Sequence, residues 1–388
     1  MTLVKKLRWV ALAAIPVLFI GAFFYWPLIK IFSHALGSEE IGDFKSLFFS
    51  GSFHQIAWFT VWQAFLSTVL TMVLALPAAY LIARYSFRGR RIFQVATTVP
   101  FVLPTVVVAG AFTALFERFG LDEGAFRLRH TVWALLAAHV FFNLAIAIRT
   151  VSTFWSGLDP RIEEQAKLLG ATPWLIFRKI TFPRLVPALT AASSIVFLFC
   201  LTSFGVILLL AGPTRATIET EIWRQAIWRG DIATASSLAV IQLVAVVVMV
   251  LLMNYLQRRQ AVVENRMDFV YEKAPRKLLV GNIFFLFIMI GLPIVVLFES
   301  SLKVGGSYSF QNFASLADRV TLVPVSALTA LKNSLLFAAV ATIFASLLGC
   351  IASFVVVHGR RWVSNLFDVS MMFPLGISAV VLGFGMLI

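Results

Sequence analysis

Four polar side chains interrupt apolar segments of the sequence. His139 and Asn143 lie four residues apart and therefore share one helix face, while Gln63 and Gln242 occur in two other apolar runs. We predict that these four residues either line a solute pathway or make hydrogen bonds between packed membrane helices. His139 shares its helix face with no second His, Cys or carboxylate, so we predict no metal site.

The patterns of common catalytic and nucleotide-binding sites are missing from the sequence. No G-x-x-x-x-G-K-[ST] loop occurs, so the chain cannot bind ATP in the Walker manner. The five histidines are scattered, and Cys200 and Cys350 fall in separate apolar runs without a CxxC pair. We therefore expect no cofactor and no catalytic cluster, and a polytopic membrane enzyme is kept only as an alternative.

The segment Glu163–Pro183 lies in a polar loop and has the capping signals of two short helices. Asp159 can cap the first helix and Pro160 can occupy its first turn. We predict that this helix ends at Gly170, because glycine readily adopts the left-handed conformation that closes a helix.

The second helix of this loop should begin at Thr172 and Pro173, and we predict that Pro183 ends it near Ile180. It displays the apolar run Trp174–Phe177 outside any membrane-length segment. Such an apolar surface needs a cover, which is either the groove of another protein or the membrane surface.

The composition places this loop in an integral membrane protein. The chain is 60% hydrophobic and 13% charged, with a mean hydropathy of +0.92. We predict an all-α fold with about nine transmembrane helices in a lipid bilayer. The predicted spans are Trp9–Ile29, Ala57–Ala83, Phe93–Phe116, Thr131–Ile148, Leu185–Leu210, Ile232–Leu256, Leu278–Phe298, Asn333–Val357 and Val369–Ile388. None contains an acidic or basic residue, which disfavours a proton- or sodium-coupled secondary transporter, the alternative from another class.

The net charge of +14 comes from Lys and Arg in short loops rather than from one basic domain, so we expect no nucleic-acid partner. With the N-terminus in the cytoplasm, 21 of the 32 Lys and Arg residues fall in cytoplasmic loops. The sequence therefore predicts a multi-pass protein of the bacterial inner membrane with a cytoplasmic N-terminus.

Two halves of the chain resemble each other at a shift of 270 residues. Gly89–Arg91 then falls on Gly359–Arg361, and Pro104 falls on Pro374. We predict a first permease unit at 1–256 with the loop at 158–184, a cytoplasmic linker at 257–277 and a partial second unit at 278–388. The second counterpart of the loop would begin near position 433, so we expect a longer, duplicated permease.

The loop resembles the EAA motif of binding-protein-dependent ABC importer permeases. The matching residues are Glu164, Ala166, Gly170, Ala171, Phe177, Ile180 and Pro183, and the motif departs from the family at Gln165. The resemblance implies a type I ABC importer permease fold, with one complete six-span unit and part of a second. It also implies that Thr172, Pro173, Trp174 and their neighbours to Arg178 contact a cytoplasmic ABC ATPase dimer, which supplies the energy.

A second resemblance concerns the solute. Ala138–Leu144, Ser203–Leu208 and Ala216–Glu219 are similar to segments of duplicated permeases that import thiamine, with ferric-iron permeases as the nearest relatives. The resemblance implies import of thiamine or a thiamine phosphate, with ferric iron as the alternative. It also implies an extracytoplasmic substrate-binding protein, whose charges could pair with those of the loop Gly212–Asp231.

Overall fold

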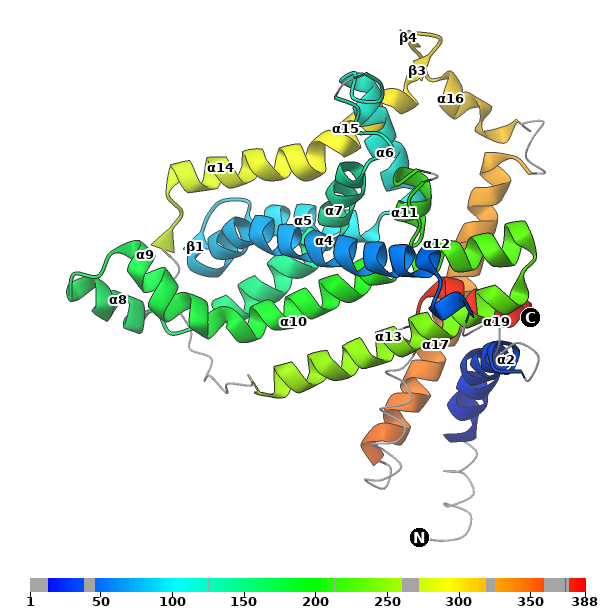
Figure 1. The fold of residues 1–388 in the computed structure, drawn as a ribbon. Helices are drawn as coiled ribbons and strands as arrows, with labels where there is room; N and C mark the ends of the chain where they lie inside the picture. Colours follow the sequence, from blue (N-terminus) through cyan, green and yellow to red (C-terminus); the bar gives the residue numbers. More distant parts are fainter. Residues whose placement is uncertain are drawn as a thin grey trace. The chain divides into compact units, whose positions relative to one another are not determined.

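The structure, a computed structural model, describes residues 13–37, 46–124, 126–212, 214–259, 272–318, 325–358, 374 and 377–388, and these are mostly helical (Figure 1). Contacts group the chain into two compact units, Gly42–Leu297 and Met1–Ile41 with Phe298–Ile388. The predicted division at 257–277 follows the sequence instead and stays a prediction, and residues 260–271 of that linker lie outside the described residues.

The larger unit, Gly42–Leu297, carries most of the helices. Its elements are α4 (Gly51–Arg84), β1 (Tyr85–Ser86), α5 (Arg90–Val102), α6 (Thr105–Arg118), α7 (Val132–Trp155), α8 (Arg161–Leu168), α9 (Pro173–Ile176), the π-helical turn η2 (Phe177–Thr181), α10 (Phe182–Leu201), α11 (Gly205–Leu210), α12 (Ile218–Trp223), the π-helical turn η3 (Arg224–Arg229), α13 (Ile232–Arg259), β2 (Glu272–Lys273), α14 (Arg276–Leu286), η4 (Phe287–Gly291) and α15 (Leu292–Ser301), which runs on into the other unit.

Within the described residues, seven helices are long and apolar enough to cross a bilayer, or eight if the bent pair α5 and α6 is one span. These eight follow the order of the first eight predicted spans. Of the ninth, Val369–Ile388, the structure describes Pro374 and residues 377–388, which include α19 (Ala379–Leu387). The described helices are thus compatible with the predicted membrane fold.

Helices α4, α7 and α10 pack against one another and form the core of the larger unit. Small residues occupy their contact faces, which lets the helix backbones approach closely without a hydrophobic driving force between them. The buried alanines are Ala64, Ala75, Ala78, Ala79 and Ala83 of α4, Ala134, Ala138, Ala145 and Ala147 of α7, and Ala188 and Ala192 of α10.

The predicted span Phe93–Phe116 is divided into α5 and α6, which meet at 103°. Leu103 is extended at the bend, with φ −69° and ψ 138°. Pro104 causes this, since its ring disfavours helical geometry at the preceding residue and it has no N–H to donate. The predicted span is therefore made of two helices with a break at Pro104.

The predicted span Leu185–Leu210 is also divided, because α10 ends at Leu201 and α11 begins at Gly205. No proline lies between these helices. A Cβ atom added to Gly205 would lie 2.5 Å from Oγ1 of Thr105, the first residue of α6. The break between α5 and α6 therefore lies next to the break between α10 and α11. Helix α11 packs along α6.

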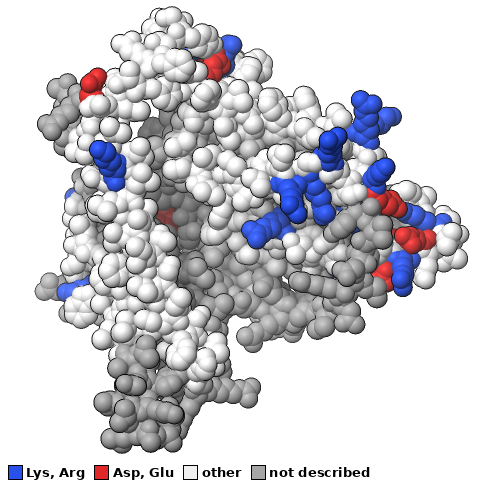
Figure 2. All heavy atoms as spheres, turned by 180° about the vertical axis from the view of Figure 1, so that it is seen from behind, with Lys and Arg blue, Asp and Glu red and all other residues white. Residues whose placement is uncertain are grey.

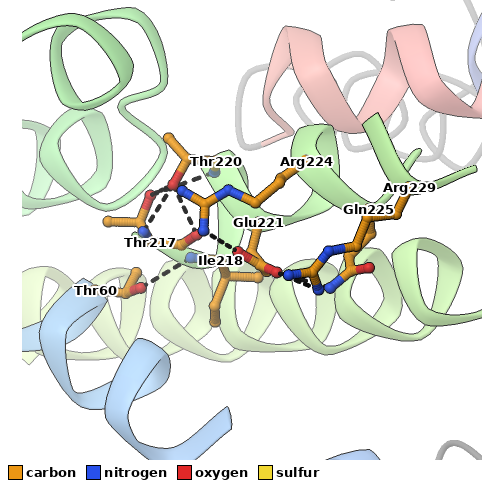
Figure 3. Close-up of polar contacts among 8 residues, drawn as sticks. All are labelled: Thr60, Thr217, Ile218, Thr220, Glu221, Arg224, Gln225 and Arg229. Carbon is orange, nitrogen blue, oxygen red and sulfur yellow. Dashed lines mark hydrogen bonds and ion pairs between the residues drawn. The ribbon is translucent and has the colours of Figure 1, made fainter. Parts of the chain in front are cut away.

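The loop between α11 and α13 contains α12 and η3, and Glu221 of α12 lies beside Arg224, Gln225 and Arg229 (Figure 3). Its backbone is joined to α4, since Ile218 N donates to Thr60 Oγ1 at 3.1 Å. Glu221 is 6% exposed and accepts hydrogen bonds from Arg224 and Gln225, at 3.0 and 2.7 Å. Glu219 is buried as well. The sequence led us to expect that these carboxylates pair with a partner protein. Because both are buried, they are not presented to one.

The smaller unit contains η1 (Gly21–Tyr25), α2 (Trp26–Ala35), the hairpin β3 (Lys303–Val304) and β4 (Ser307–Tyr308), α16 (Gln311–Ala314), η5 (Ser315–Ala317), α17 (Ala327–His358) and α19. Helices α2 and α19 pack closely, because a Cβ atom added to Gly385 would lie 2.8 Å from the carbonyl oxygen of Pro27. The apolar side chains of α17 are largely exposed within the chain.

From the contacts of Glu221 we predict that replacing two neighbouring arginines lowers the stability of the protein by unequal amounts. Arg224 lies 3.0 Å from the carboxylate and is 28% exposed, whereas Arg229 lies 3.8 Å away and is 60% exposed. Arg224→Ala should lower the free energy of unfolding in detergent by about 1.5–3 kcal/mol, and Arg229→Ala by less than about 1 kcal/mol. Equal losses in denaturant titrations would show that Arg224 has no special role.

Candidate functional site

The loop predicted at 158–184 is a hairpin of α8 and the helix that follows it. Gly170 closes α8 with a φ of +84°, so the predicted left-handed turn is confirmed. Gly170 N donates to Lys167 O and Ala171 N donates to Ala166 O, both at 3.0 Å. This pair of bonds is a Schellman motif, which satisfies the last carbonyls of the helix and reverses the chain.

The second helix of the hairpin begins as predicted, since Thr172 Oγ1 accepts from Leu175 N at 3.3 Å and Pro173 takes the first position. It does not end at Pro183, and that prediction was wrong. The helix continues from Pro173 to Leu201 through the π-helical turn η2, in which Phe182 N donates to Phe177 O. The wider turn accommodates Pro183, which has no N–H, at the start of α10.

An ion pair fastens this hairpin to the end of α4. Arg84 Nη2 donates to Glu163 Oε1 at 2.9 Å, and Arg84 Nη1 donates to the carbonyl of Leu158 at 3.1 Å. Thr181 Oγ1 donates to the same Glu163 oxygen at 2.8 Å. Both charged side chains are less than one-fifth exposed. Glu163 therefore joins α4, α8 and η2.

Sequence reasoning missed these anchoring residues, because it placed the motif acid at Glu164. Glu164 is exposed in the structure, one residue from the carboxylate that makes the contacts. Arg84 lies 79 residues away in sequence and so gives no local pattern. The one available signal was the placement of Glu163 in the first turn of a capped helix, where an acidic residue is favourable.

Three loops that the sequence predicts to be cytoplasmic meet at this end of the larger unit. The strand β1 pairs in parallel with β2, with Tyr85 opposite Glu272. Ser86 Oγ also donates to the carbonyl of Glu272 at 3.2 Å. Figure 2 shows Lys and Arg side chains gathered at one end, with a few acidic ones among them. The basic residues of the three loops whose side chains the structure describes are Arg84, Arg88, Arg90, Arg91, Arg149, Arg161, Lys167, Arg178, Lys179, Arg184, Lys273, Arg276 and Lys277.

The hairpin presents an apolar surface, which we call the tip surface and define as Leu168, Leu169, Trp174 and Leu175. These side chains are 88%, 88%, 68% and 47% exposed. Ile176, the next residue, is buried instead. One turn of helix thus places large apolar side chains outward while its other face packs on the protein.

The remaining motif residues shape the hairpin. Phe177 is half-buried and its ring stacks on Trp174, with the ring centroids 5.8 Å apart. Ala166, Ala171 and Ile180 are half-buried as well. The predicted residues are therefore gathered in one hairpin, but only part of them is exposed for contact with another protein.

The four polar residues predicted for a pathway lie inside the helix bundle. His139 bonds through Nδ1 to Ser67 Oγ at 2.9 Å and through Nε2 to Ser203 Oγ at 3.0 Å. The side chain of Asn143 donates to Cys200 Sγ at 3.5 Å.

The two glutamines are held in different places. Gln63 Nε2 donates to the carbonyl of Cys200 at 2.9 Å, whereas Gln242 Nε2 donates to Glu219 Oε1 at 3.3 Å. His139, Asn143 and Gln63 are therefore neighbours around the end of α10, and Gln242 belongs to the α12 contacts. All four predicted side chains are at most 4% exposed and bridge helices.

Comparison with known proteins identifies a common family. The chain matches the family described as binding-protein-dependent transport system inner membrane component over residues 72–262. It is 31% identical over 209 residues to the sulfate transport system permease protein CysT of Escherichia coli (strain K12), covering 52% of this chain and 75% of CysT. It is equally identical to the thiamine transport system permease protein ThiP of Salmonella typhimurium, of which it spans 39%.

A solved structure supports the fold. A bacterial ABC transporter involved in the import of the acidic polysaccharide alginate matches with a TM-score of 0.54 at 21% identity, covering 66% of this chain and 97% of that one. The family consists of membrane permeases and not of enzymes. The chain belongs to the binding-protein-dependent transport system inner membrane components, the permeases of ABC importers.

Proposed function

We propose that the hairpin at 158–184 is the coupling element of this permease and that its tip surface seats in a cytoplasmic ABC ATPase dimer. The observation that carries the proposal is the exposure of Leu168, Leu169 and Trp174 on a rigid hairpin at the basic end of the larger unit. Apolar side chains in water are stabilised by a partner with a complementary groove.

The anchoring of the hairpin supports a mechanical role. Arg84 and Thr181 hold Glu163 on both sides, so a displacement of α8 is passed to α4 and to the helix Pro173–Leu201. ATP-driven closure of two ATPase subunits would move the hairpin as a rigid body. The attached spans would then change between outward and inward access.

The distribution of charge supports an orientation. The basic loops that meet beside β1 would lie in the cytoplasm by the positive-inside rule, which places the N-terminus in the cytoplasm of a bacterial inner membrane. The family description, binding-protein-dependent, supports a substrate-binding protein on the opposite face.

For the solute we propose thiamine or a thiamine phosphate, on the likeness to ThiP together with the segments Ala138–Leu144 and Ser203–Leu208. Sulfate is a second candidate, because CysT is equally similar and is covered over more of its length. Ferric iron is supported only by the sequence resemblance.

The tip surface predicts a loss of coupling without a loss of folding. Trp174→Asp or Leu169→Asp should weaken co-purification of the ATPase by at least about thirtyfold in affinity, since a charge in an apolar contact costs about 2 kcal/mol or more. Phe126→Asp is the matched control, because Phe126 is 84% exposed in the loop between α6 and α7. Undiminished ATPase binding by both tip variants would contradict the proposal.

Because Arg84 contacts Glu163, we predict that replacing Glu163 destabilises α8 and that replacing Glu164 does not. Glu163→Gln keeps the shape of the side chain but removes the charge that Arg84 contacts. Amide exchange in α8 should then quicken about tenfold, which corresponds to a loss of about 1.4 kcal/mol in local stability. Glu164→Gln should change nothing. Equal exchange rates in the two variants, measured by mass spectrometry, would show that the ion pair does not hold the hairpin.

Uptake measurements distinguish the solutes. Bacteria that lose this gene should take up less labelled thiamine at nanomolar concentrations and keep normal uptake of labelled sulfate. The reverse result would assign the chain to sulfate transport. Unchanged uptake of thiamine would overturn the thiamine proposal while leaving the coupling role intact.

A further inference from the structure

The break between α10 and α11 has no covalent cause. Thr202 closes α10 and α11 begins at Gly205, in the middle of an apolar run that contains no proline between residues 188 and 212. The break between α5 and α6, by contrast, is fixed by Pro104. Without a proline, the interruption depends on the Ser203–Gly205 segment and on its tertiary contacts.

The segment on one side of this break is firmly held. Gln63 Nε2 donates to the Cys200 carbonyl at 2.9 Å, and Asn143 Nδ2 donates to Cys200 Sγ at 3.5 Å. Because both contacts reach Cys200, the end of α10 is fixed to α4 and α7.

The segment on the other side packs mainly against a different helix. Gly205 lies against Thr105, so the first residue of α11 rests on the first residue of α6. Helix α11 packs along α6 beyond that point. Helix α6 is separated from α5 by the 103° bend, and both α6 and α11 also contact α7 through apolar side chains such as Phe112.

The side chain of His139 joins the break to α4 by hydrogen bonds. His139 Nε2 lies 3.0 Å from Ser203 Oγ, and His139 Nδ1 lies 2.9 Å from Ser67 Oγ. A neutral imidazole has one N–H and one acceptor nitrogen, so one serine hydroxyl donates to the ring and the other accepts from it. The chain Ser67–His139–Ser203 therefore fixes the position of the break relative to α4 and α7.

We propose that residues 202–205 are a hinge of the transport cycle and that His139 is its positioning residue. The hydrogen bond from His139 to Ser203 holds α6 and α11 at one angle to α4, α7 and α10. When this bond opens, the two helices swing as one body about the hinge. Apolar contacts with α7 can slide, whereas this hydrogen bond is directional, so its opening lets the hinge exchange between two angles, as a gating element requires.

Two near-isosteric variants separate the hinge bond from simple packing. Glutamine places its amide nitrogen near the position of Nε2, so His139→Gln keeps the bond to Ser203. Asparagine places its amide near Nδ1, so His139→Asn keeps only the side facing Ser67. Ser203→Ala removes the hinge bond directly, and Thr68→Ala, whose hydroxyl bonds within α4 to Ala64, is the control.

The hinge angle is measured between spin labels at Ile195 of α10 and Leu209 of α11, which are 40% and 41% exposed. The full chain, with Cys350→Ser to remove the exposed native thiol, is placed in lipid nanodiscs for pulsed electron spin resonance. We expect one narrow distance distribution for three proteins: the labelled protein without further substitution, His139→Gln and Thr68→Ala. His139→Asn and Ser203→Ala should give a distribution at least twice as wide or a second distance.

The inference fails if His139→Asn and His139→Gln give the same distribution, since the histidine would then act only through its volume. It also fails if Ser203→Ala leaves the distribution narrow, a result that is informative even where a histidine variant does not fold. The measurement uses neither solute nor ATPase, so its failure is distinguishable from a failure of the coupling proposal.

Discussion

The contact between Arg84 and Glu163 determines how the basic end of the larger unit is built. A carboxylate removed from water is costly unless an opposite charge and hydrogen bonds compensate it, and Glu163 has both in Arg84 and Thr181. Because Arg84 ends α4 and Thr181 precedes α10, one carboxylate ties the loop to two helices of the core. Without it, α8 would be a helix of eight residues with marginal stability of its own.

Local signals in the sequence were enough to predict the shape of the hairpin. Gly170 and Thr172 act through bonds to residues within five positions, so their effect can be read from neighbouring letters. The prediction that the second helix ends at Pro183 was wrong because it too used only local signals. A proline ends most helices, and nothing nearby indicates that a π-helical turn will accommodate it.

Contacts between distant residues could not be predicted in this way. The sequence placed the motif acid at Glu164, whereas Glu163 makes the contacts, and this difference depends on Arg84, 79 residues away. Similarly, His139 was recognised as unusual, while its partners Ser67 and Ser203 were not, because serine in a membrane helix is common. Helix length and apolar character were predictable, and the breaks within helices were predictable only where a proline marks them.

Photo-crosslinking in native membranes tests most directly whether the tip surface contacts an ATPase. A photoreactive phenylalanine analogue at Trp174 should give a covalent adduct with the ATPase subunit, whereas the same analogue at Phe126, which is 84% exposed in the loop between α6 and α7, should give none. Adducts of equal yield at both positions, or an ATPase that forms none at Trp174, would contradict the assignment of the hairpin.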